Sequence, residues 1–268
     1  MQWQMTDHVR VRTLCLLILL FMPALVLADT SEIREPLKLV TGPHYAPFAA
    51  DYLPSKGLGP YLISRIFEAS GRNATTDVRP WNRAYRETLN GRYDAILPYI
   101  ETPDRKDVYL FSVPVFKADS YAYVMADSKI DAHSLAGLKG RKYCNPLGFA
   151  DGSALSEMRS NGEIARLSAA NLESCFKMLA VGRVDFIKIN QYVANYVIRQ
   201  IDLSADNIRK LPFLVERISL HVMVPKTRPE AQALISEFDR AFSEMNQSGR
   251  IQEWTQNYLE TLDSLSEQ

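Results

Sequence analysis

The sequence has little cysteine, no excess charge of either sign and only one long apolar run. Lys+Arg and Asp+Glu both number 31 among 268 residues, so the formal net charge is zero. A chain with no net charge lacks the positive potential that favours binding to nucleic acid or to an anionic membrane surface. Hydrophobic residues make up 47% and charged residues 23%, the balance of a globular protein. The length suits one large domain or two of about 100 residues each.

The sequence also lacks the short motifs that carry common catalytic or metal chemistry. It contains no nucleophile elbow, no phosphate-binding glycine loop and no His-Glu-x-x-His. No Cys-x-x-Cys or close histidine pair offers a zinc site. His44 and His221 are lone histidines, which are more often structural than catalytic. We therefore expect no metal and no cofactor.

The apolar run at the N-terminus has the three-part pattern of a secretory signal peptide. Arg10 and Arg12 precede apolar residues from Leu14 to Ala28, interrupted by one proline. The run is too short and too broken for a comfortable membrane span of about 20 residues, and an uncleaved anchor is the alternative. We expect residues 1–28 to be removed after Ala28, which places the mature chain in the periplasm.

Cysteine usage agrees with export. Of the three cysteines, Cys15 lies in the expected signal peptide. Cys144 and Cys175 remain, and a pair in an oxidising compartment is best explained as one disulfide. Two buried free thiols are the alternative. In the chain-entropy model, closing a loop of this length stabilises the fold by roughly 3–4 kcal/mol, less any strain.

Apolar periodicity predicts an α/β protein. The first part of the mature chain runs strand-helix-strand-helix-strand, which is typical of a parallel sheet covered by helices. The ligand sites of such sheets lie at the carboxyl ends of the strands. The third strand, which begins at Tyr93, is expected to stop at Pro98 and bend away there. The expected strands are 37–40, a short one at Val78, and 93–99, and the expected helices are 57–71 and 81–90.

The rest of the chain predicts a second α/β unit followed by a helical C-terminus. No internal repeat, low-complexity stretch or flexible linker interrupts it. The expected strands are 121–125, 142–145, 164–167, 184–189 and 220–224, and the expected helices are 134–140, 154–160, 172–182, 191–200 and two after Pro229.

Four stretches, taken in order and spacing, resemble a known family. They are YAPF at 45–48, PWNRA at 80–84, GRYDA at 91–95 running into TPDR at 102–105 and FS at 111–112, and LAGLKG at 135–140; GRVD at 182–185 repeats the glycine turn. Each is weak alone. Together they make the mature chain similar to the type II periplasmic solute-binding proteins, specifically the family 3 branch that includes polar-amino-acid binders.

The resemblance implies two α/β lobes, each a mostly parallel sheet flanked by helices, with the ligand held between them. Two crossing strands near 113–120 and 214–220 join the lobes, which close by hinge bending. The expected boundaries are 29–117 for the first lobe, 118–216 for the second and 217–268 for the return with its C-terminal helices. Such a protein is a monomer that binds a small molecule and presents it to an ABC permease.

The resemblance also implies a ligand site. The arginine of the T-P-x-R turn holds the ligand's carboxylate in this family, and by position it is Arg105. A guanidinium matches a carboxylate with two parallel hydrogen bonds. The alternative is a surface arginine that caps the next turn or pairs with Asp104 or Asp107. The other candidates are Tyr45 and Trp81, for which core packing is the alternative, and Tyr99, Ile100, Asn145, Phe149 and Asn190.

Three residues depart from the pattern of amino-acid binders. Asn190 occupies the position of an aspartate that pairs with the ligand's ammonium, and a neutral amide cannot offset a buried cation. Pro98 offers no amide donor, and Ile100 replaces a threonine. We therefore expect a small carboxylate-bearing solute, or another small polar or aromatic one, and not a standard α-amino acid.

An enzyme on the same fold, of the cyclohexadienyl dehydratase type, is the alternative to a binding protein. That chemistry needs a positioned general acid. Glu101, next to the predicted site, is the candidate, and an outward-facing loop carboxylate is its structural alternative. A third possibility is a ligand-sensing subunit for a membrane signalling protein. We expect a binding protein without catalytic residues.

Overall fold

The computed structural model describes residues 35–201 and 205–266. The predicted signal peptide and its cleavage after Ala28 lie outside the described residues and stay predictions. Within the described ranges, no helix is long and apolar enough to cross a membrane.

The first part of the chain folds as predicted, with parallel strands connected by helices. β1 is the middle strand of three and pairs in parallel with both β2 and β3. The carboxyl ends of these strands therefore lie at one edge, as expected for a ligand-binding α/β unit. The elements are β1 (Leu37–Thr41), α1 (Leu58–Ala69), β2 (Ala74–Val78), α2 (Trp81–Leu89) and β3 (Ala95–Ile100).

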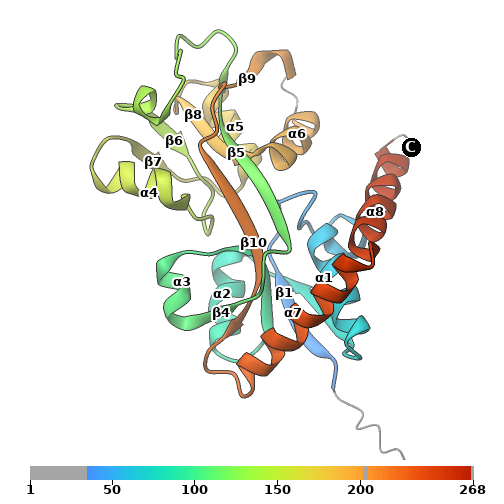
Figure 1. Ribbon diagram of the computed structural model, residues 1–268. Coiled ribbons are helices and arrows are strands. Elements are labelled where there is room, and N and C mark those ends of the chain that lie inside the picture. The colour runs from blue at the N-terminus through green and yellow to red at the C-terminus, as the bar shows by residue number, and fades with distance from the viewer. Residues whose placement is uncertain (1–34, 202–204, 267–268) are drawn as a thin grey trace, which may run out of the picture. The chain divides into compact units, whose positions relative to one another are not determined.

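Two long antiparallel strands connect this unit to the next one. β5 (Phe116–Met125) and β10 (Glu216–Pro225) pair over a register that runs from Ser120 opposite Glu216 to Phe116 opposite Leu220. Figure 1 shows them side by side between the two groups of elements. In the described residues the sheet order is β2-β1-β3-β10-β5-β8-β6-β7, so this pair occupies its centre.

The second unit again has parallel strands. β6 pairs in parallel with β7 and β8, and β8 pairs antiparallel with β5. Both predicted parallel units are therefore present, joined through the antiparallel pair. The elements are β6 (Lys142–Cys144), α4 (Gly152–Ser160), β7 (Ala165–Leu167), α5 (Leu172–Ala180), β8 (Phe186–Asn190) and α6 (Gln191–Gln200).

The end of β3 differs from the sequence prediction. The strand does not stop at Pro98 but continues to Ile100, where it pairs with Leu220 of β10. The pairing with β10 shifts register between His221 and Met223. A bulge in a ladder accommodates a proline, which has no N–H to donate.

Several short elements and two long C-terminal helices complete the fold. The sequence did not predict α3, β4 or β9, each of which spans only three to six residues. Elements this short contain too few residues to show the apolar periodicity from which a helix or strand is predicted. The remaining elements are η1 (Pro54–Lys56), α3 (Pro103–Val108), β4 (Tyr109–Phe111), η2 (Leu135–Leu138), η3 (Ala205–Asn207), β9 (Ile208–Lys210), α7 (Ala231–Gln247) and α8 (Arg250–Ser266).

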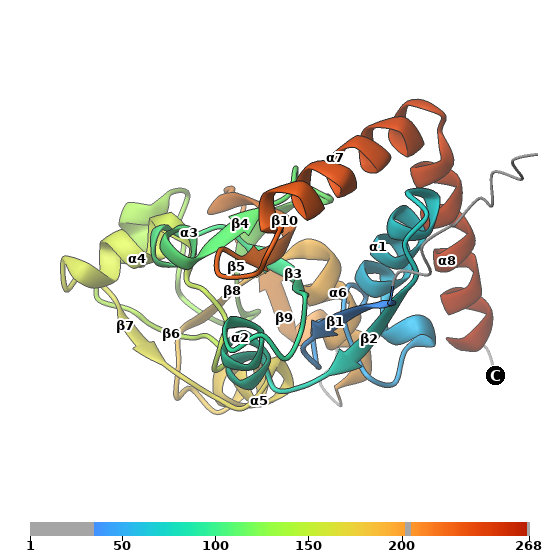
Figure 2. The same cartoon turned by 90° about the horizontal axis from the view of Figure 1, so that it is seen from below.

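Separate apolar clusters stabilise the two ends of the sheet. At the first end, α1, α7 and α8 pack together (Figure 2), and the tilted rings of Phe67 and Phe238 lie in one buried cluster with Leu39. At the second end, Leu155 of α4 packs with Tyr143 and Phe186. A third cluster lies between them and includes many residues of the site described below.

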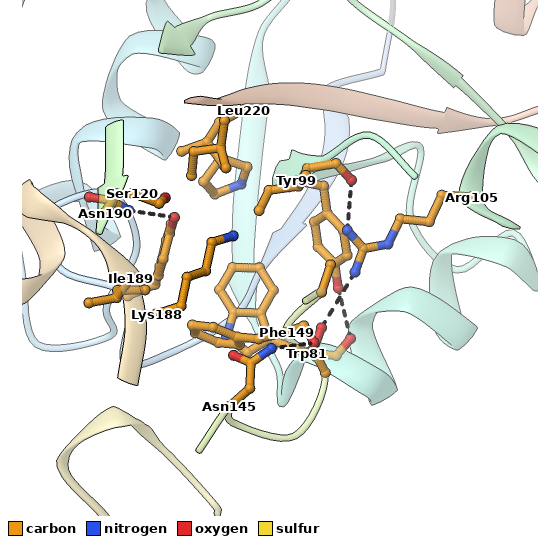
Figure 3. Close-up of a pocket in the computed structure, with 16 residues that line it drawn as sticks. Trp81, Tyr99, Arg105, Ser120, Asn145, Phe149, Lys188, Ile189, Asn190 and Leu220 are labelled. Atoms are coloured by element: carbon orange, nitrogen blue, oxygen red, sulfur yellow. Dashed lines mark hydrogen bonds between the residues drawn. The ribbon is translucent and has the colours of Figure 1, made fainter. Parts of the chain in front are cut away.

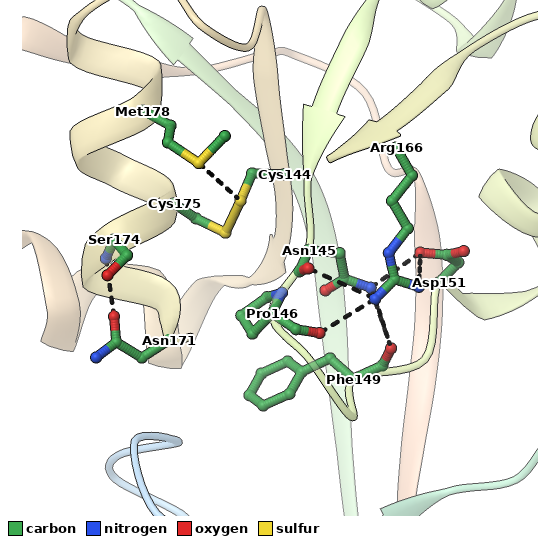
Figure 4. The surroundings of a disulfide bond; sticks show 10 residues. All are labelled: Cys144, Asn145, Pro146, Phe149, Asp151, Arg166, Asn171, Ser174, Cys175 and Met178. Atoms are coloured by element: carbon green, nitrogen blue, oxygen red, sulfur yellow. Dashed lines mark hydrogen bonds and ion pairs between the residues drawn. A yellow bond between two sulfur atoms is a disulfide. The ribbon is translucent and has the colours of Figure 1, made fainter. Parts of the chain in front are cut away.

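The predicted disulfide is present. Cys144, at the end of β6, is bonded to Cys175 of α5 across a separation of 31 residues. Both residues are fully buried, and the bond between their sulfur atoms (Figure 4) excludes the alternative of two buried free thiols.

Candidate ligand-binding site

A single pocket collects the residues that the sequence predicted for the ligand. Its walls come from the loop after β1, the first residue of α2, the ends of β3 and β8, α3, β5, β10 and the loop 145–151. Figure 3 shows the labelled side chains converging on it. The predicted residues that line it are Tyr45, Trp81, Tyr99, Ile100, Arg105, Asn145, Phe149 and Asn190.

Four aromatic rings form much of the pocket wall. Tyr45, Trp81 and Tyr99 are at most 9% exposed, and Phe149 is half-buried. The ring centroids of contacting pairs lie 5.3–6.2 Å apart, mostly in edge-to-face geometry, which aromatic pairs prefer. Core packing and pocket lining therefore do not exclude each other here, since these rings do both.

Local contacts fix the orientation of Trp81. Its indole Nε1 donates a hydrogen bond to the Pro43 carbonyl at 2.9 Å, and its own carbonyl accepts one from the Tyr99 hydroxyl at 3.1 Å. Gly42 leaves room for the indole, because a Cβ at that position would overlap the ring. The loop after β1 and the first residue of α2 are thereby held as one wall of the pocket.

Asn190 ends β8 and caps α6 at the same time. Its Oδ1 accepts a hydrogen bond from the Val193 amide at 3.1 Å, and its Nδ2 donates to the Tyr45 hydroxyl at 2.8 Å. The side chain is fully buried. Burial raises the pKa of the Tyr45 hydroxyl, so that hydroxyl stays neutral. Asn190 thus has a structural role as an N-cap in addition to its place on the pocket wall.

Arg105 comes from the first turn of α3 and reaches back to the end of β3. Its Nη1 donates to the Ile100 carbonyl at 2.7 Å, and its Nη2 lies 3.5 Å from the Gly148 carbonyl. The guanidinium carbon lies 4.5 Å from the centroid of the Tyr99 ring, within cation–π range. Desolvation lowers the pKa of this guanidinium, which nevertheless remains charged at neutral pH.

Among the described residues, no carboxylate forms an ion pair or hydrogen bond with the Arg105 guanidinium. The sequence alternative was pairing with Asp104 or Asp107, yet among the ion pairs of the described residues neither acid reaches the Arg105 side chain. Both neutral partners of Arg105 are backbone carbonyls. A half-buried cation with open donor positions is what an anionic ligand requires.

Lys188 is a second cation on the pocket wall, and sequence reasoning missed it. Its ammonium lies 2.8 Å from Glu216 Oε2 and donates to the Asp151 carbonyl at 3.2 Å. Figure 3 shows the side chain reaching toward the centre of the pocket. The available signal was a lysine within an otherwise apolar buried strand, because a buried lysine needs a partner or a function. Ser120, also missed, lines the pocket and is buried.

Buried ionic contacts hold the loop 145–151 in place. Arg166 pairs with Asp151 at 3.0 Å and donates to the carbonyls of Pro146 and Phe149 at 3.1 and 3.4 Å (Figure 4). Asn145 donates to the same aspartate at 2.9 Å. These contacts fix the backbone that carries Phe149 into the pocket.

Glu101 lies outside the pocket. It is exposed and pairs with Lys106 at 2.6 Å. It lines a wider adjoining groove, which shares Arg105 and Tyr99 with the pocket. The lone histidine His221 is buried and bonded to the Ser112 carbonyl and the Ser219 hydroxyl, which is a structural arrangement.

Comparison with known proteins agrees with this architecture. The bacterial extracellular solute-binding proteins, family 3, match residues 37–261. A comparison with curated proteins finds no match. Among the described residues, no group of acids, histidines and cysteines is placed to hold a metal ion.

Three solved structures illustrate the neighbours. A periplasmic binding protein of an arginine transport system from Legionella pneumophila is 18% identical, with 84% of this chain and all of that chain covered and a TM-score of 0.69. A histidine kinase sensor domain similar to periplasmic binding proteins is 17% identical, with coverages of 84% and 96% and a TM-score of 0.72. An ancestral amino-acid-binding protein, a precursor of cyclohexadienyl dehydratase, is 17% identical, with coverages of 83% and 95% and a TM-score of 0.67.

At these identities the structural likeness establishes the fold, which is the two-lobed type II periplasmic-binding-protein fold predicted from the sequence. The family match covers most of the chain, including every residue of the pocket. The chain belongs to the bacterial extracellular solute-binding proteins, family 3.

Proposed function

We propose that this protein captures a small carboxylate-bearing solute in the periplasm and presents it to an ABC importer, with Arg105 as the anchor of the carboxylate. The supporting observation is the charge balance of Arg105. Its guanidinium lines the pocket, is partly desolvated, and has only backbone carbonyls as hydrogen-bond partners in the described residues. A ligand carboxylate would supply the missing negative charge.

The arrangement of the strands supports a closing motion. β5 and β10 are the connections between the two parallel units, at the positions where the resemblance implies hinge strands. The proposed lobes are residues 29–117 and 118–216, with 217–268 returning to the first. Arg105 and Phe149 then approach the ligand from different lobes, so closure completes the site.

Binding is a better proposal than catalysis because the pocket has no acidic side chain. Glu101, the candidate general acid, is exposed, ion-paired with Lys106 and set in the adjoining groove. An enzyme is the second candidate, because one of the similar structures is a precursor of cyclohexadienyl dehydratase. Incubating the purified protein with prephenate or arogenate and measuring product formation separates the two, since a binding protein gives no turnover.

The experiment on the anchor compares native protein with Arg105→Ala. A thermal-shift screen of organic acids and amino acids first identifies binders, because a tight ligand raises the melting temperature by mass action. Losing one partner of a buried, hydrogen-bonded charge pair costs about 2–5 kcal/mol, which is roughly 30-fold or more in affinity. We expect calorimetry to show at least that loss for every carboxylate binder. Unchanged affinity in Arg105→Ala would refute the anchor.

A matched control for this variant is Arg83→Ala. Arg83 is a solvent-exposed arginine of α2 that pairs with Glu87 at 2.8 Å, away from the pocket. Its loss should leave carboxylate affinity unchanged. If both variants weaken binding equally, a general charge effect and not an anchor explains the result.

A further inference from the structure

The charged side chains of the pocket are all cationic. Of the 16 residues that line it, only Arg105 and Lys188 carry a formal charge, and none is an aspartate or a glutamate. A ligand ammonium placed here would find no carboxylate to offset its charge, and leaving an ammonium unpaired in a desolvated site is costly.

The acid that pairs with Lys188 already has several hydrogen-bond partners. Glu216 accepts hydrogen bonds from Lys188, from the Ser153 amide and from the Ser153 hydroxyl, at 2.8, 2.7 and 2.7 Å. Gly152 lies so close that a Cβ there would overlap the Glu216 carboxylate. Glu216 lines the adjoining groove and not the pocket. The lysine therefore presents its charge to the pocket, while its counter-ion faces away.

The neutral acceptors on the wall do not replace an acid. Both polar atoms of the Asn190 side chain are occupied, by Val193 and by Tyr45. Asn145 uses its amide to hold Asp151. A free amide or carbonyl oxygen can accept a hydrogen bond from an ammonium, but it cannot cancel the charge.

The remaining wall is apolar. Besides the four aromatic rings, the side chains of Ile100, Ile189, Ile218 and Leu220 line the pocket. Such a surface stabilises an aromatic ring or a branched chain and penalises a polar or charged one. The Lys188 charge is balanced by Glu216, so Arg105 leaves one positive charge to be matched, which fits one carboxylate.

We infer that the ligand is a monocarboxylate with an aromatic or branched apolar body and without an ammonium group. This inference rests on the proposed function and narrows its ligand class. Within it, Lys188 is a specificity-determining residue, because the ammonium end of its neutral pair with Glu216 faces the pocket and disfavours a ligand ammonium there.

The test uses pairs of ligands that differ only in the ammonium. We would titrate 3-phenylpropanoate against L-phenylalanine and 4-methylpentanoate against L-leucine into the native protein by calorimetry at neutral pH. The deaminated acid of at least one pair should bind at least about tenfold more tightly than its amino acid, since like charges brought together in a binding site are strongly disfavoured.

The outcomes separate this inference from the proposed function. Equal or tighter binding of the amino acids, lost in Arg105→Ala, overturns the inference and leaves the proposed function standing. The same holds if neither deaminated acid binds but another carboxylate, such as succinate or L-glutamate, binds through Arg105. If no carboxylate binds at all, both proposals are overturned.

A charge-neutral double variant tests the role of Lys188. Lys188→Met with Glu216→Gln removes both charges and keeps a side-chain oxygen for Ser153, so neither partner is left unpaired. The ratio of amino-acid to deaminated-acid dissociation constants should fall severalfold. The control is Asp94→Asn with Arg228→Gln, another partly buried ion pair, 2.9 Å apart and outside the pocket, which should leave the ratio unchanged. An unchanged ratio in the Lys188 double variant would contradict its assigned role.

Discussion

The two walls of the pocket differ in how their charges are satisfied. On the wall made by the end of β3 and by α3, Arg105 has no acidic partner within the described residues. On the wall made by β8, the start of β10 and the loop 145–151, Lys188 pairs with Glu216, and Asp151 pairs with Arg159 and Arg166. A covalent bond from Cys144 to Cys175 reinforces the second wall.

The paired charges of the second wall stabilise the fold, whereas the charge of Arg105 on the first wall is available to a ligand. A buried ion pair that has lost one partner is strongly destabilised, so the second wall depends on its contacts for folding. A cation whose partners are backbone carbonyls contributes little to folding and remains available to an external anion. Unfolding measurements on variants of each wall can test whether the two kinds of charge differ in this way.

The largest difference should appear between Lys188→Met and Arg105→Met in urea unfolding. The side chains of Lys188 and Glu216 are only 7% and 15% exposed, and removing the lysine leaves the carboxylate uncompensated. We expect Lys188→Met to lose about 3–5 kcal/mol of the free energy of unfolding. Arg105→Met leaves no acid uncompensated and should lose only about 1.5 kcal/mol, the lower end of the range for hydrogen bonds that involve a charged group. Similar losses in the two variants would remove the distinction between the walls.

Breaking the disulfide should cost slightly less than breaking the ion pair. The chain-entropy model gives roughly 3–4 kcal/mol for a 31-residue loop, which Cys144→Ser with Cys175→Ser would remove. The loss should appear in the free energy of unfolding, and native protein should show no free thiols by mass spectrometry after alkylation. A double variant as stable as the native protein would show that the covalent bond does not stabilise the second wall.

The smallest effect is a pH dependence set by Glu216. Burial alone would raise the pKa of this carboxyl, but the Lys188 ammonium and the hydrogen bonds from Ser153 outweigh it and hold the pKa below its usual 4.5. The unfolded state therefore binds the proton more tightly, so the stabilisation is complete above about pH 4.5 and is lost as the pH falls below it. The stability advantage of native protein over Lys188→Met/Glu216→Gln should shrink in that range. An advantage that is constant from pH 7 to pH 3 would be inconsistent with a lowered pKa.

The fold was largely predictable because its longer elements have clear periods. The helix of Leu172, Cys175 and Phe176 and the alternating first strand follow from apolar spacing alone. The continuation of β3 past Pro98 was not predictable, because it depends on β10, a partner strand more than a hundred residues later in the chain. Strand pairing between distant segments has no local signature.

The lining of the candidate pocket was predictable in part on both walls, but the ion pair on the second wall was not. Arg105 and Tyr45 stand in short recognisable motifs, and the structure places both in the pocket. Lys188 stands in no motif, and its role depends on Glu216, which folds next to it from another strand. The double use of Asn190, as a helix cap and as a partner of Tyr45, likewise appears only once the chain is folded.

The most direct test of Arg105 as the carboxylate anchor is a thermodynamic cycle in which the ligand's charge and the Arg105 side chain are removed separately and together. Calorimetry would measure 3-phenylpropanoate and its uncharged analogue 3-phenylpropanamide against native protein and Arg105→Ala. The account predicts that removing Arg105 weakens the acid by roughly 30-fold or more and the amide by much less, because only the acid forms the charge pair. Equal losses for acid and amide would contradict Arg105 as the carboxylate anchor.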